Sequence, residues 1–273
     1  SRNPTCGYGI RRLRERTDLM NATLLAICSF VFMFAGAILG MLIQRFLPEH
    51  HSSSASKDAV KLGAGLIATM AALTLGLLVG SSKSTFDTVN SSVMQLGAKT
   101  IYLDRLLSNY GPEASAARTE LRQSVVNGLH LIWPEEVLDG PLAPQPAVGM
   151  SSLELVGKSI RQLKSTDASQ SYLRTEALAA NEAILQARWL LVEQRRNALP
   201  TALFVLPLLW LSLLNGIYGL FAPRNHTVVA VLLACALSVS GALFLVLEMT
   251  TPLEGTIKVS SFPLRQALND IGN

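Results

Sequence analysis

The stretch LGAGLIATMAALTLGLLVGSS (residues 62–82) runs for twenty-one residues without a charge. At about 1.5 Å per residue, a helix of this length spans about 30 Å, the thickness of the hydrocarbon core of a bilayer. No proline follows before Pro112, and apolar residues continue beyond Ser82 at alternating spacings of three and four. These positions are Phe86, Val89, Val93, Leu96, Leu103, Leu107 and Tyr110, interrupted only by Thr100. We therefore predict one helix that leaves the membrane and continues into a soluble part.

Three further segments are long and apolar enough to cross a bilayer. Hydrophobic residues make up 49% of the chain and the mean hydropathy is +0.35, which favours a membrane protein over an ordinary soluble one. The uncharged windows cover residues 21–44, 62–82, 197–223 and 227–247. Each window has at least the length that a spanning helix needs. The sequence thus predicts an all-α polytopic membrane protein with four transmembrane helices.

The segment between the second and third spans has the pattern of a helical bundle. Gly111 and Pro112 end the long helix, because glycine allows a turn and proline suits the first position of a new helix. Four prolines without periodicity predict a loop at 134–149. Ser151 with Glu154 forms a capping box for the next helix, and Thr166 or Asp167 can cap the one after it. We expect these helices and the end of the long helix to form an antiparallel four-helix bundle.

Composition divides the chain into five parts. Residues 1–20 form a basic N-terminal extension, and residues 21–82 hold transmembrane helices 1 and 2. The soluble bundle covers 83–199, and transmembrane helices 3 and 4 lie within 200–248. Residues 249–273 form a C-terminal tail. We expect the bundle to be inserted between the second and third spans.

The distribution of lysine and arginine predicts that both termini and the bundle lie in the cytoplasm. Twelve basic residues would then flank the spans inside, against four outside, in line with the positive-inside rule. The inside residues are Arg2, Arg11, Arg12, Arg14, Arg16, Lys83, Lys99, Arg188, Arg195, Arg196, Lys258 and Arg265. The outside residues are Arg45, Lys57, Lys61 and Arg224. If the chain starts at Met20, five arginines are lost and the ratio becomes seven to four.

The sequence contains no catalytic or cofactor-binding motif, so we expect neither an enzyme nor a bound cofactor. The histidines lie apart from any reactive cysteine or serine, and the glycines of residues 62–82 belong to a span rather than a phosphate-binding loop. His50 and His51 adjoin Glu49, but neighbouring residues rarely ligate one ion, and a solvated interfacial loop is the simpler interpretation. Twelve basic and twelve acidic residues in 83–199 leave no basic face for nucleic acid.

Small and polar residues recur on one face of the second span, at spacings of three and four. They are Lys61, Gly65, Thr69, Ala72, Gly76, Gly80, Lys83, Asp87 and Asn90. In one interpretation, the residues from Gly65 to Asn90 line a water-filled path whose charged ends select ions. In the other, the small side chains let helices pack closely. The sequence leaves both interpretations open.

Two polar residues in the later spans are further candidates. Asn215 needs a hydrogen-bond partner in hydrocarbon, so we expect it to face another helix. Glu248 follows the fourth span, where the interface should begin. Together with His50, His51 and Lys61, these two residues form our set of interfacial polar candidates.

Three segments of the chain resemble the bacterial bestrophin-like domain family. They are LPEHHSSSASKDAVKLGAGLIATMAALTLGLLVGSSKSTFDT (residues 47–88), LLNGIYGLFAPRN (213–225) and LFLVLEMTTPLEGTIKVSSFPLRQAL (243–268). The Pro-Glu-His-His and Ser-Lys-Asp elements and the later Leu-Glu, Val-Ser and Pro-Leu-Arg elements follow in the family order. Leu253 stands where the family more often has an aromatic residue, and the first nineteen residues match nothing in the family pattern.

The resemblance implies distant kinship with bestrophin anion channels. Those channels are oligomers with four membrane helices per subunit, a pore lined by the second helix and a helical cytoplasmic domain between the second and third. The sequence has no acidic cluster like the calcium clasp of the animal channels, so calcium gating is not implied.

Our leading hypothesis is a homo-oligomeric ion channel of the bacterial inner membrane, with a pore for small anions lined by the second span. Its partners would be the lipid bilayer, small ions and further copies of the chain. The alternative is a membrane-anchored sensor or interaction protein, whose bundle binds a ligand or partner without conduction. A bundle outside the cell would favour the alternative.

Overall fold

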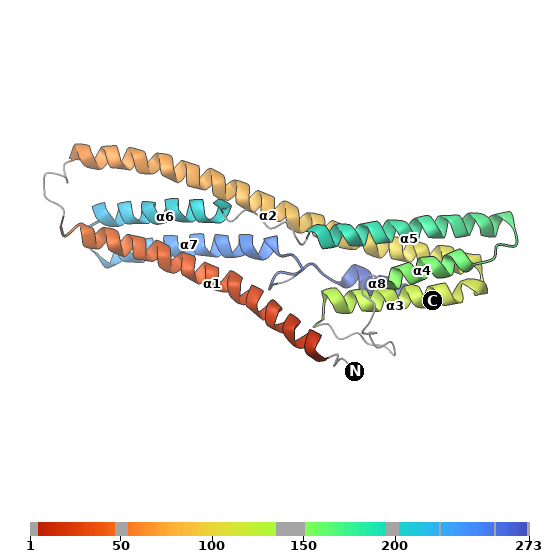
Figure 1. Ribbon diagram of the computed structural model, residues 1–273. Helices are drawn as coiled ribbons and strands as arrows, with labels where there is room; N and C mark the ends of the chain where they lie inside the picture. Colours follow the sequence, from red (N-terminus) through yellow and green to blue (C-terminus); the bar gives the residue numbers. More distant parts are fainter. Residues whose placement is uncertain are drawn as a thin grey trace. The chain divides into compact units, whose positions relative to one another are not determined.

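The computed structural model describes residues 5–46, 54–134, 151–194, 202–223, 225–253 and 255–271 of the 273-residue chain. All regular elements in these ranges are helical, which confirms the predicted all-α class. In chain order (Figure 1) they are α1 (Thr5–Ile43), α2 (Ser54–Tyr110), the 3-10 helix η2 (Pro112–Ala114), α3 (Ser115–Ile132), α4 (Ser151–Gln162), α5 (Ala168–Gln194), α6 (Ala202–Phe221), α7 (His226–Thr250) and α8 (Phe262–Asp270).

The chain divides into two compact units, and the boundary between them falls within α2, after Phe86. The membrane unit comprises Cys6–Phe86 and Ala198–Ile257. The soluble unit comprises Ser1–Thr5, Asp87–Asn197 and Lys258–Asn273. Each unit therefore combines segments that are far apart in the sequence.

Helix α2 continues without interruption for 57 residues, which corresponds to about 86 Å at the rise of an α-helix. Its soluble part buries the face that the spacing of three and four predicts. The buried residues are Val89, Val93, Leu96, Thr100, Leu103, Leu107 and Tyr110, and Phe86 is half-buried. The predicted extension of the second span into a soluble part is confirmed.

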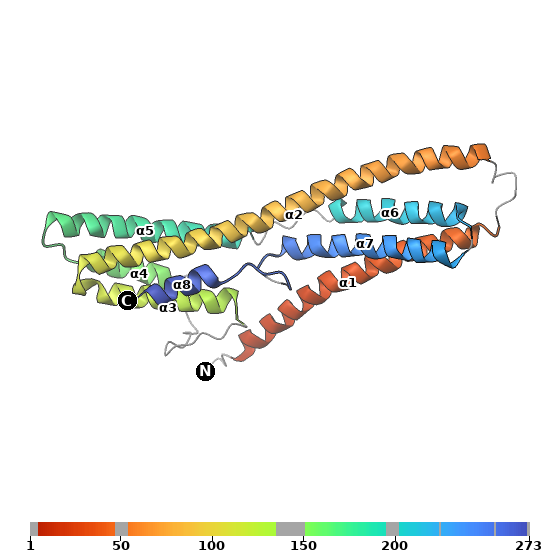
Figure 2. The same cartoon turned by 180° about the vertical axis from the view of Figure 1, so that it is seen from behind.

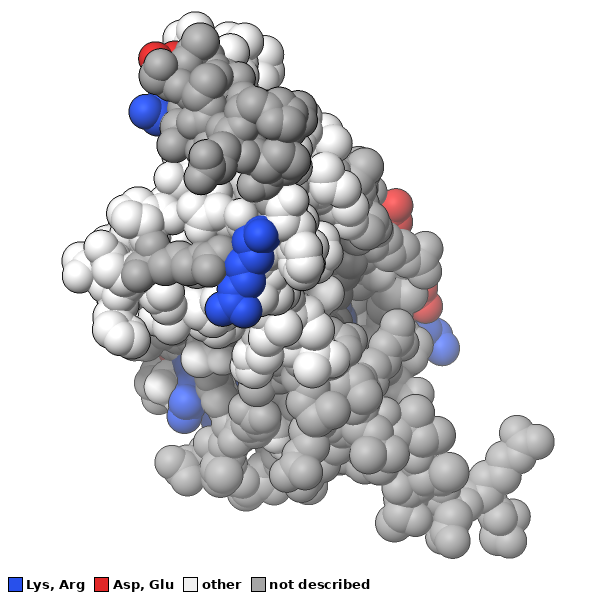
Figure 3. Space-filling model, turned by 90° about the vertical axis from the view of Figure 1, so that its left-hand side faces the viewer, with Lys and Arg blue, Asp and Glu red and all other residues white. Residues whose placement is uncertain are grey.

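The membrane unit contains the four predicted spans. Among the described residues, the helices long and apolar enough to cross a bilayer are Ala22–Ile43, the first part of Asp58–Tyr110, Leu203–Phe221 and His226–Thr250. Leu78 of α2 packs with Leu243 and Val246 of α7, and Leu208 of α6 adjoins this cluster. Figure 2 shows α6 running beside α7. Figure 3 shows few charged side chains among the described residues on its face of the molecule.

Glycines hold α1 and α6 at a short distance from each other. A Cβ atom added at Gly36 would lie 2.7 Å from Ser212 Oγ, closer than real Cβ contacts. A Cβ added at Gly40 would overlap the carbonyl oxygen of Gly216, and one added at Gly219 would overlap a carbonyl oxygen of α1. Small residues in this pattern let helix backbones approach closely in membranes. These glycines are therefore required for the α1–α6 contact.

The soluble unit contains the predicted four-helix bundle, in which α4 packs against α3 and α5. Side-chain hydrogen bonds also connect the neighbouring helices. They join Asp104 to Arg118 (α2 and α3), Ser124 to Ser152 and Glu120 to Ser159 (α3 and α4), and Tyr102 to Glu176 (α2 and α5). The predicted cap of α5 is present, because the Gln170 backbone N–H donates to Asp167 Oδ1 at 2.7 Å.

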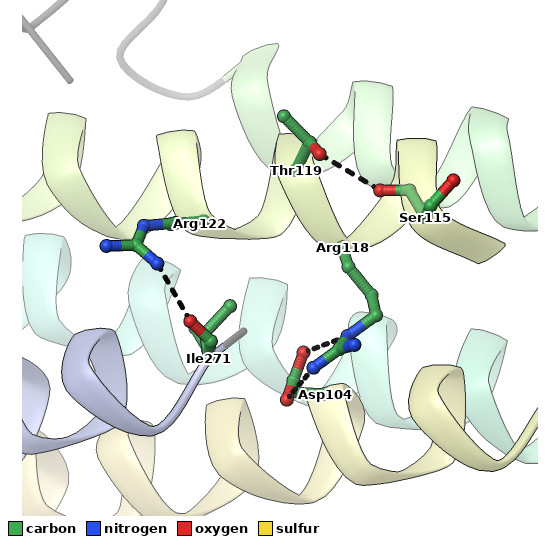
Figure 4. A network of polar contacts seen from close by, with 6 residues as sticks. All are labelled: Asp104, Ser115, Arg118, Thr119, Arg122 and Ile271. Carbon is green, nitrogen blue, oxygen red and sulfur yellow. Dashed lines mark hydrogen bonds and ion pairs between the residues drawn. The ribbon is translucent and has the colours of Figure 1, made fainter. Parts of the chain in front are cut away.

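A bidentate ion pair joins α2 to α3 (Figure 4). Arg118 donates from Nε to Asp104 Oδ1 at 2.8 Å and from Nη2 to Oδ2 at 3.0 Å. The Asp104 side chain is 6% exposed, and that of Arg118 is 25% exposed. The hydrogen bond to Asp104 raises the pKa of the Arg118 guanidinium. One turn further along α3, Arg122 Nη1 donates to the Ile271 carbonyl oxygen at 2.9 Å.

We expect Asp104→Ala to destabilise the soluble unit by about 3 kcal/mol, because removing one member of a buried ion pair leaves the other charge uncompensated. The measurement is thermal unfolding of the purified protein, followed by circular dichroism. Asp58→Ala is the matched control, since Asp58 pairs with Lys61 at 3.7 Å but both side chains are largely exposed. If the two variants melted at the same temperature, the ion pair would have no structural role.

The C-terminal segment forms a helix, α8, that the sequence analysis did not predict. Its Pro263 lies against Gly97 of α2, where an added Cβ would be 2.8 Å from the Pro263 carbonyl oxygen. Trp133, after the end of α3, donates from Nε1 to the carbonyl oxygen of Val259 at 2.9 Å. Residues 258–271 therefore pack within the soluble unit.

Candidate functional site

One line of small and apolar side chains on α2 is buried in the membrane unit. Ala64, Ala71 and Leu78 are 2% exposed or less, and they recur every seven residues. Leu78 belongs to the apolar cluster with α6 and α7. We call these three residues the buried line of α2. The other sides of this part of α2 are largely exposed within one copy of the chain.

The small and polar residues that the sequence singles out lie on one of these exposed sides. We call them the α2 stripe, which comprises Gly65, Thr69, Ala72, Gly76, Gly80, Lys83, Asp87 and Asn90. All are exposed except Asn90, which is half-buried. Cβ atoms added at Gly65, Gly76 or Gly80 would meet no atom within 4 Å. Within the part of one copy that the structure describes, then, no neighbouring side chain or backbone requires these positions to be glycine.

The stripe, the buried line and a ridge of large apolar residues occupy three different sides of α2. At about 100° per residue, the stripe lies about 135° from the buried line. The ridge comprises Leu62, Leu66, Met70, Leu73 and Leu77, which are all more than half exposed. It lies about 85° from the stripe and about 140° from the buried line. A ridge of large apolar side chains suits contact with acyl chains, whereas the stripe consists of small and polar residues.

Charged side chains flank the uncharged part of the stripe. Lys61 pairs with Asp58 at 3.7 Å at one end. At the other end, Lys83 Nζ lies 5.7 Å from the centre of the Phe86 ring, in a cation–π contact, and Asp87 follows one turn later. Lys61 and Lys83 are separated by about 33 Å along the helix, close to the thickness of the hydrocarbon core. We therefore expect the two lysines to lie at the levels where water and lipid meet.

Asn215 lies within the membrane unit, where it is 5% exposed on α6. Its neighbour on the same helix, Ser212, is also buried and donates from Oγ to the Phe32 carbonyl oxygen of α1 at 3.2 Å. This side of α6 therefore carries the polar and small residues that contact α1. Participation of Asn215 in this packing stays a prediction.

Glu248 is 1% exposed and holds the turn that follows α7. Its Oε2 accepts hydrogen bonds from the backbone N–H groups of Thr256 and Ile257, at 2.5 and 3.0 Å. Gly255 has a φ of +89°, and a Cβ there would lie 2.8 Å from Glu248 Oε2. Carboxylates that accept backbone N–H bonds are common stabilisers of turns. The geometry thus gives Glu248 a structural role in one copy of the chain.

No group of three or more metal-ligating side chains is found in the part of the chain that the structure describes. His50 and His51 lie outside the described residues. The α2 stripe is therefore the candidate site, and its chemistry is that of a mildly polar surface with charges at its ends.

The bestrophin-like domain model matches residues 30–264. The chain belongs to the bestrophin-like domain family. The match includes the whole α2 stripe, the glycines between α1 and α6, and the Glu248 turn. No curated protein sequence matches the chain significantly.

Solved structures of a bestrophin homolog from Klebsiella pneumoniae share the fold of this family member. One variant of that homolog has 15% identity and a TM-score of 0.63, over 91% of this chain and 99% of the homolog. A second variant has 17% identity and a TM-score of 0.56, over 90% and 94% of the two chains. At such identities the likeness concerns the fold, so the residues of this chain must carry any argument about its function.

The sequence analysis missed the α1 side of the α1–α6 contact. Gly36 and Gly40 form a Gly-x-x-x-Gly pattern within the first span, which is a recognised signal for close helix packing. This pattern would have predicted that α1 approaches another helix closely. It would not have identified α6 as the partner, because the small residues of α2 have the same spacing.

Proposed function

We propose that this family member is a homo-oligomeric ion channel, with copies of α2 arranged around a path for small anions. The open Cβ positions at Gly65, Gly76 and Gly80 carry this proposal. Glycine within a helix costs up to about 1 kcal/mol relative to alanine, and no described part of one copy offsets that cost by close packing. The small size of these glycines would instead keep the path between several copies of α2 wide.

A lysine at each end of the path supports small anions as the conducted ions. Lys61 and Lys83 would form rings of positive charge near the two ends of the membrane part in an oligomer, and such rings raise the local concentration of anions. Asp58, which pairs with Lys61 at 3.7 Å, and Asp87, which lies one turn beyond Lys83, add negative charge at the two ends, so each mouth would contain both signs. Between the two rings the stripe has no charged side chain, and its one hydroxyl group, that of Thr69, donates to the Gly65 carbonyl oxygen at 2.9 Å.

The experiment is reconstitution of the full chain in lipid vesicles, with chloride and potassium efflux recorded separately against protein-free vesicles. We expect chloride flux above the background, and a smaller potassium flux. Absence of flux under every ion gradient and pH tested would contradict conduction. Flux of potassium alone would leave a channel but reject anion selectivity.

The location that fits this proposal is the bacterial inner membrane, with the soluble unit in the cytoplasm. The excess of lysine and arginine on the predicted inside flanks supports this orientation. A reporter enzyme fused within residues 134–149 measures it directly. We expect activity from a reporter that works only in the cytoplasm. Activity from a reporter that works only in the periplasm would favour the sensor alternative.

A further inference from the structure

Close to its C-terminal end, just before Glu193 and Gln194, α5 has exposed apolar side chains on a helix whose outer side is otherwise mostly polar. The exposed residues earlier on this helix include Ser171, Thr175, Glu182 and Gln186. Trp189 and Leu190 then follow, with 55% and 57% of their surface exposed, and Val192 is 37% exposed. We call these three residues the α5 end patch.

Residues 189–192 are apolar on every side of the helix, since Leu191 is buried while the α5 end patch faces outward, and the exposed Glu193 follows directly at the edge of the patch. A helix that is hydrophobic all round is usually covered all round. Among the described residues, the chain covers only the side of Leu191. Arg188 precedes this turn, and burial lowers the pKa of its guanidinium.

Contacts between α2 and α5 fix the level of the α5 end patch. Gln170 Nε2 donates to the Tyr110 carbonyl oxygen at 3.4 Å, and Tyr102 Oη donates to Glu176 Oε1 at 3.2 Å. The two helices are thus antiparallel. Because both helices rise by the same distance per residue, this register can be continued toward the end of α5. It places Trp189 at the level of about residue 90 of α2. That level is the soluble end of the α2 stripe.

The distance from the end of the membrane span to the level of the α5 end patch shows whether lipid or protein can cover the patch. Residue 90 lies about 12 Å beyond Ser82, the last residue of the uncharged window. The polar layer on each side of the hydrocarbon core is about 5–8 Å thick. The α5 end patch therefore lies beyond the lipid. Copies of α2 around one axis, in contrast, would bring soluble units side by side at this level.

We propose that a second copy of this chain covers the α5 end patch, in a contact between subunits beside the soluble mouth of the path. This inference rests on the proposed homo-oligomer and names one of its contact surfaces. Trp189 is suited to the role, because tryptophan buries a large area at low entropic cost and is enriched at the centres of interfaces. Leu190 and Val192 extend the apolar area on either side.

The experiment places the photo-crosslinker p-benzoylphenylalanine at position 189 of the full chain and irradiates membranes that contain it. We expect a product at twice the 29.4 kDa mass of one chain on a denaturing gel. Position 172 is the matched control. Tyr172 is also an exposed aromatic residue of α5, at 66%, but it lies at the opposite end of the helix. We expect at most a trace of the dimeric product there.

Three outcomes would overturn the inference: lipid adducts at position 189, no adduct there, or equal products at 189 and 172. A second variant with the crosslinker at position 190 repeats the test, in case the change at 189 prevents folding. The flux measurement is independent of this test. Flux without a dimeric product would reject this contact alone, and a dimeric product without flux would reject conduction alone.

Discussion

Gly40→Ala should abolish the folded membrane unit, although it adds only one methyl group. The added Cβ would overlap the carbonyl oxygen of Gly216, and neither group belongs to a side chain that can rotate away. Helices α1 and α6 would have to separate, which would also break the hydrogen bond from Ser212 to the backbone of α1. Overpacking that side chains can accommodate costs about 1–3 kcal/mol, so a backbone overlap should cost at least about 3 kcal/mol.

The measurement is the amount of monodisperse protein recovered in detergent, together with its melting temperature. Gly241→Ala is the matched control, because a Cβ added at Gly241 of α7 would meet no atom within 4 Å. Both substitutions gain about 1 kcal/mol of helix propensity, so the difference between them isolates the overlap. Equal recovery and equal melting of the two variants would mean that α1 and α6 do not approach as described.

Gly76→Leu should reduce ion flux at least about tenfold while the protein stays folded, because a ring of leucines would narrow the path and expel water from it. The fold should tolerate the change, since a Cβ at Gly76 meets no atom within 4 Å and leucine suits a membrane helix. The flux assay in vesicles measures the effect, at equal amounts of reconstituted protein.

Gly63→Leu is the matched control for this variant. Gly63 lies on the same helix, and its Cβ position is equally open. It lies about 145° around the helix from the α2 stripe, so its leucine should leave the flux unchanged. Equal flux from the two variants would remove the stripe from the path. Loss of folded protein with Gly76→Leu alone would instead indicate that the stripe packs closely against another copy.

The extended helix was predictable because its signals are local. Alternation of three and four from Val89 to Tyr110 describes one face of a helix, and the structure buries that face. The four spans are equally visible, since each is a long uncharged window. Helix α8 was missed because it is short and its contacts are distant in sequence. Gly97 and Trp133, which hold that segment, lie more than a hundred residues before it.

The candidate site was predictable only as a pattern on one helix. The spacing from Gly65 to Asn90 identifies residues that share a face, and the structure shows that this face is exposed in one copy. Spacing cannot say which glycines are packed. Gly40 and Gly76 both lie in apolar helices among similar neighbours, yet one has no space for a Cβ and the other is open. That difference depends on which helices meet, and this is a tertiary property.

In the turn after α7, the residue types allowed at positions 248 and 255 depend on each other. Glu248 occupies the space that any side chain at position 255 would need, and Gly255 adopts a backbone angle that few other residues tolerate. A shorter side chain at position 248 would free space at position 255, although the positive φ of Gly255 would still disfavour other residues there, so the effects of the two substitutions should fall short of additive. Among relatives of this chain, we therefore expect the residues at these two positions to covary.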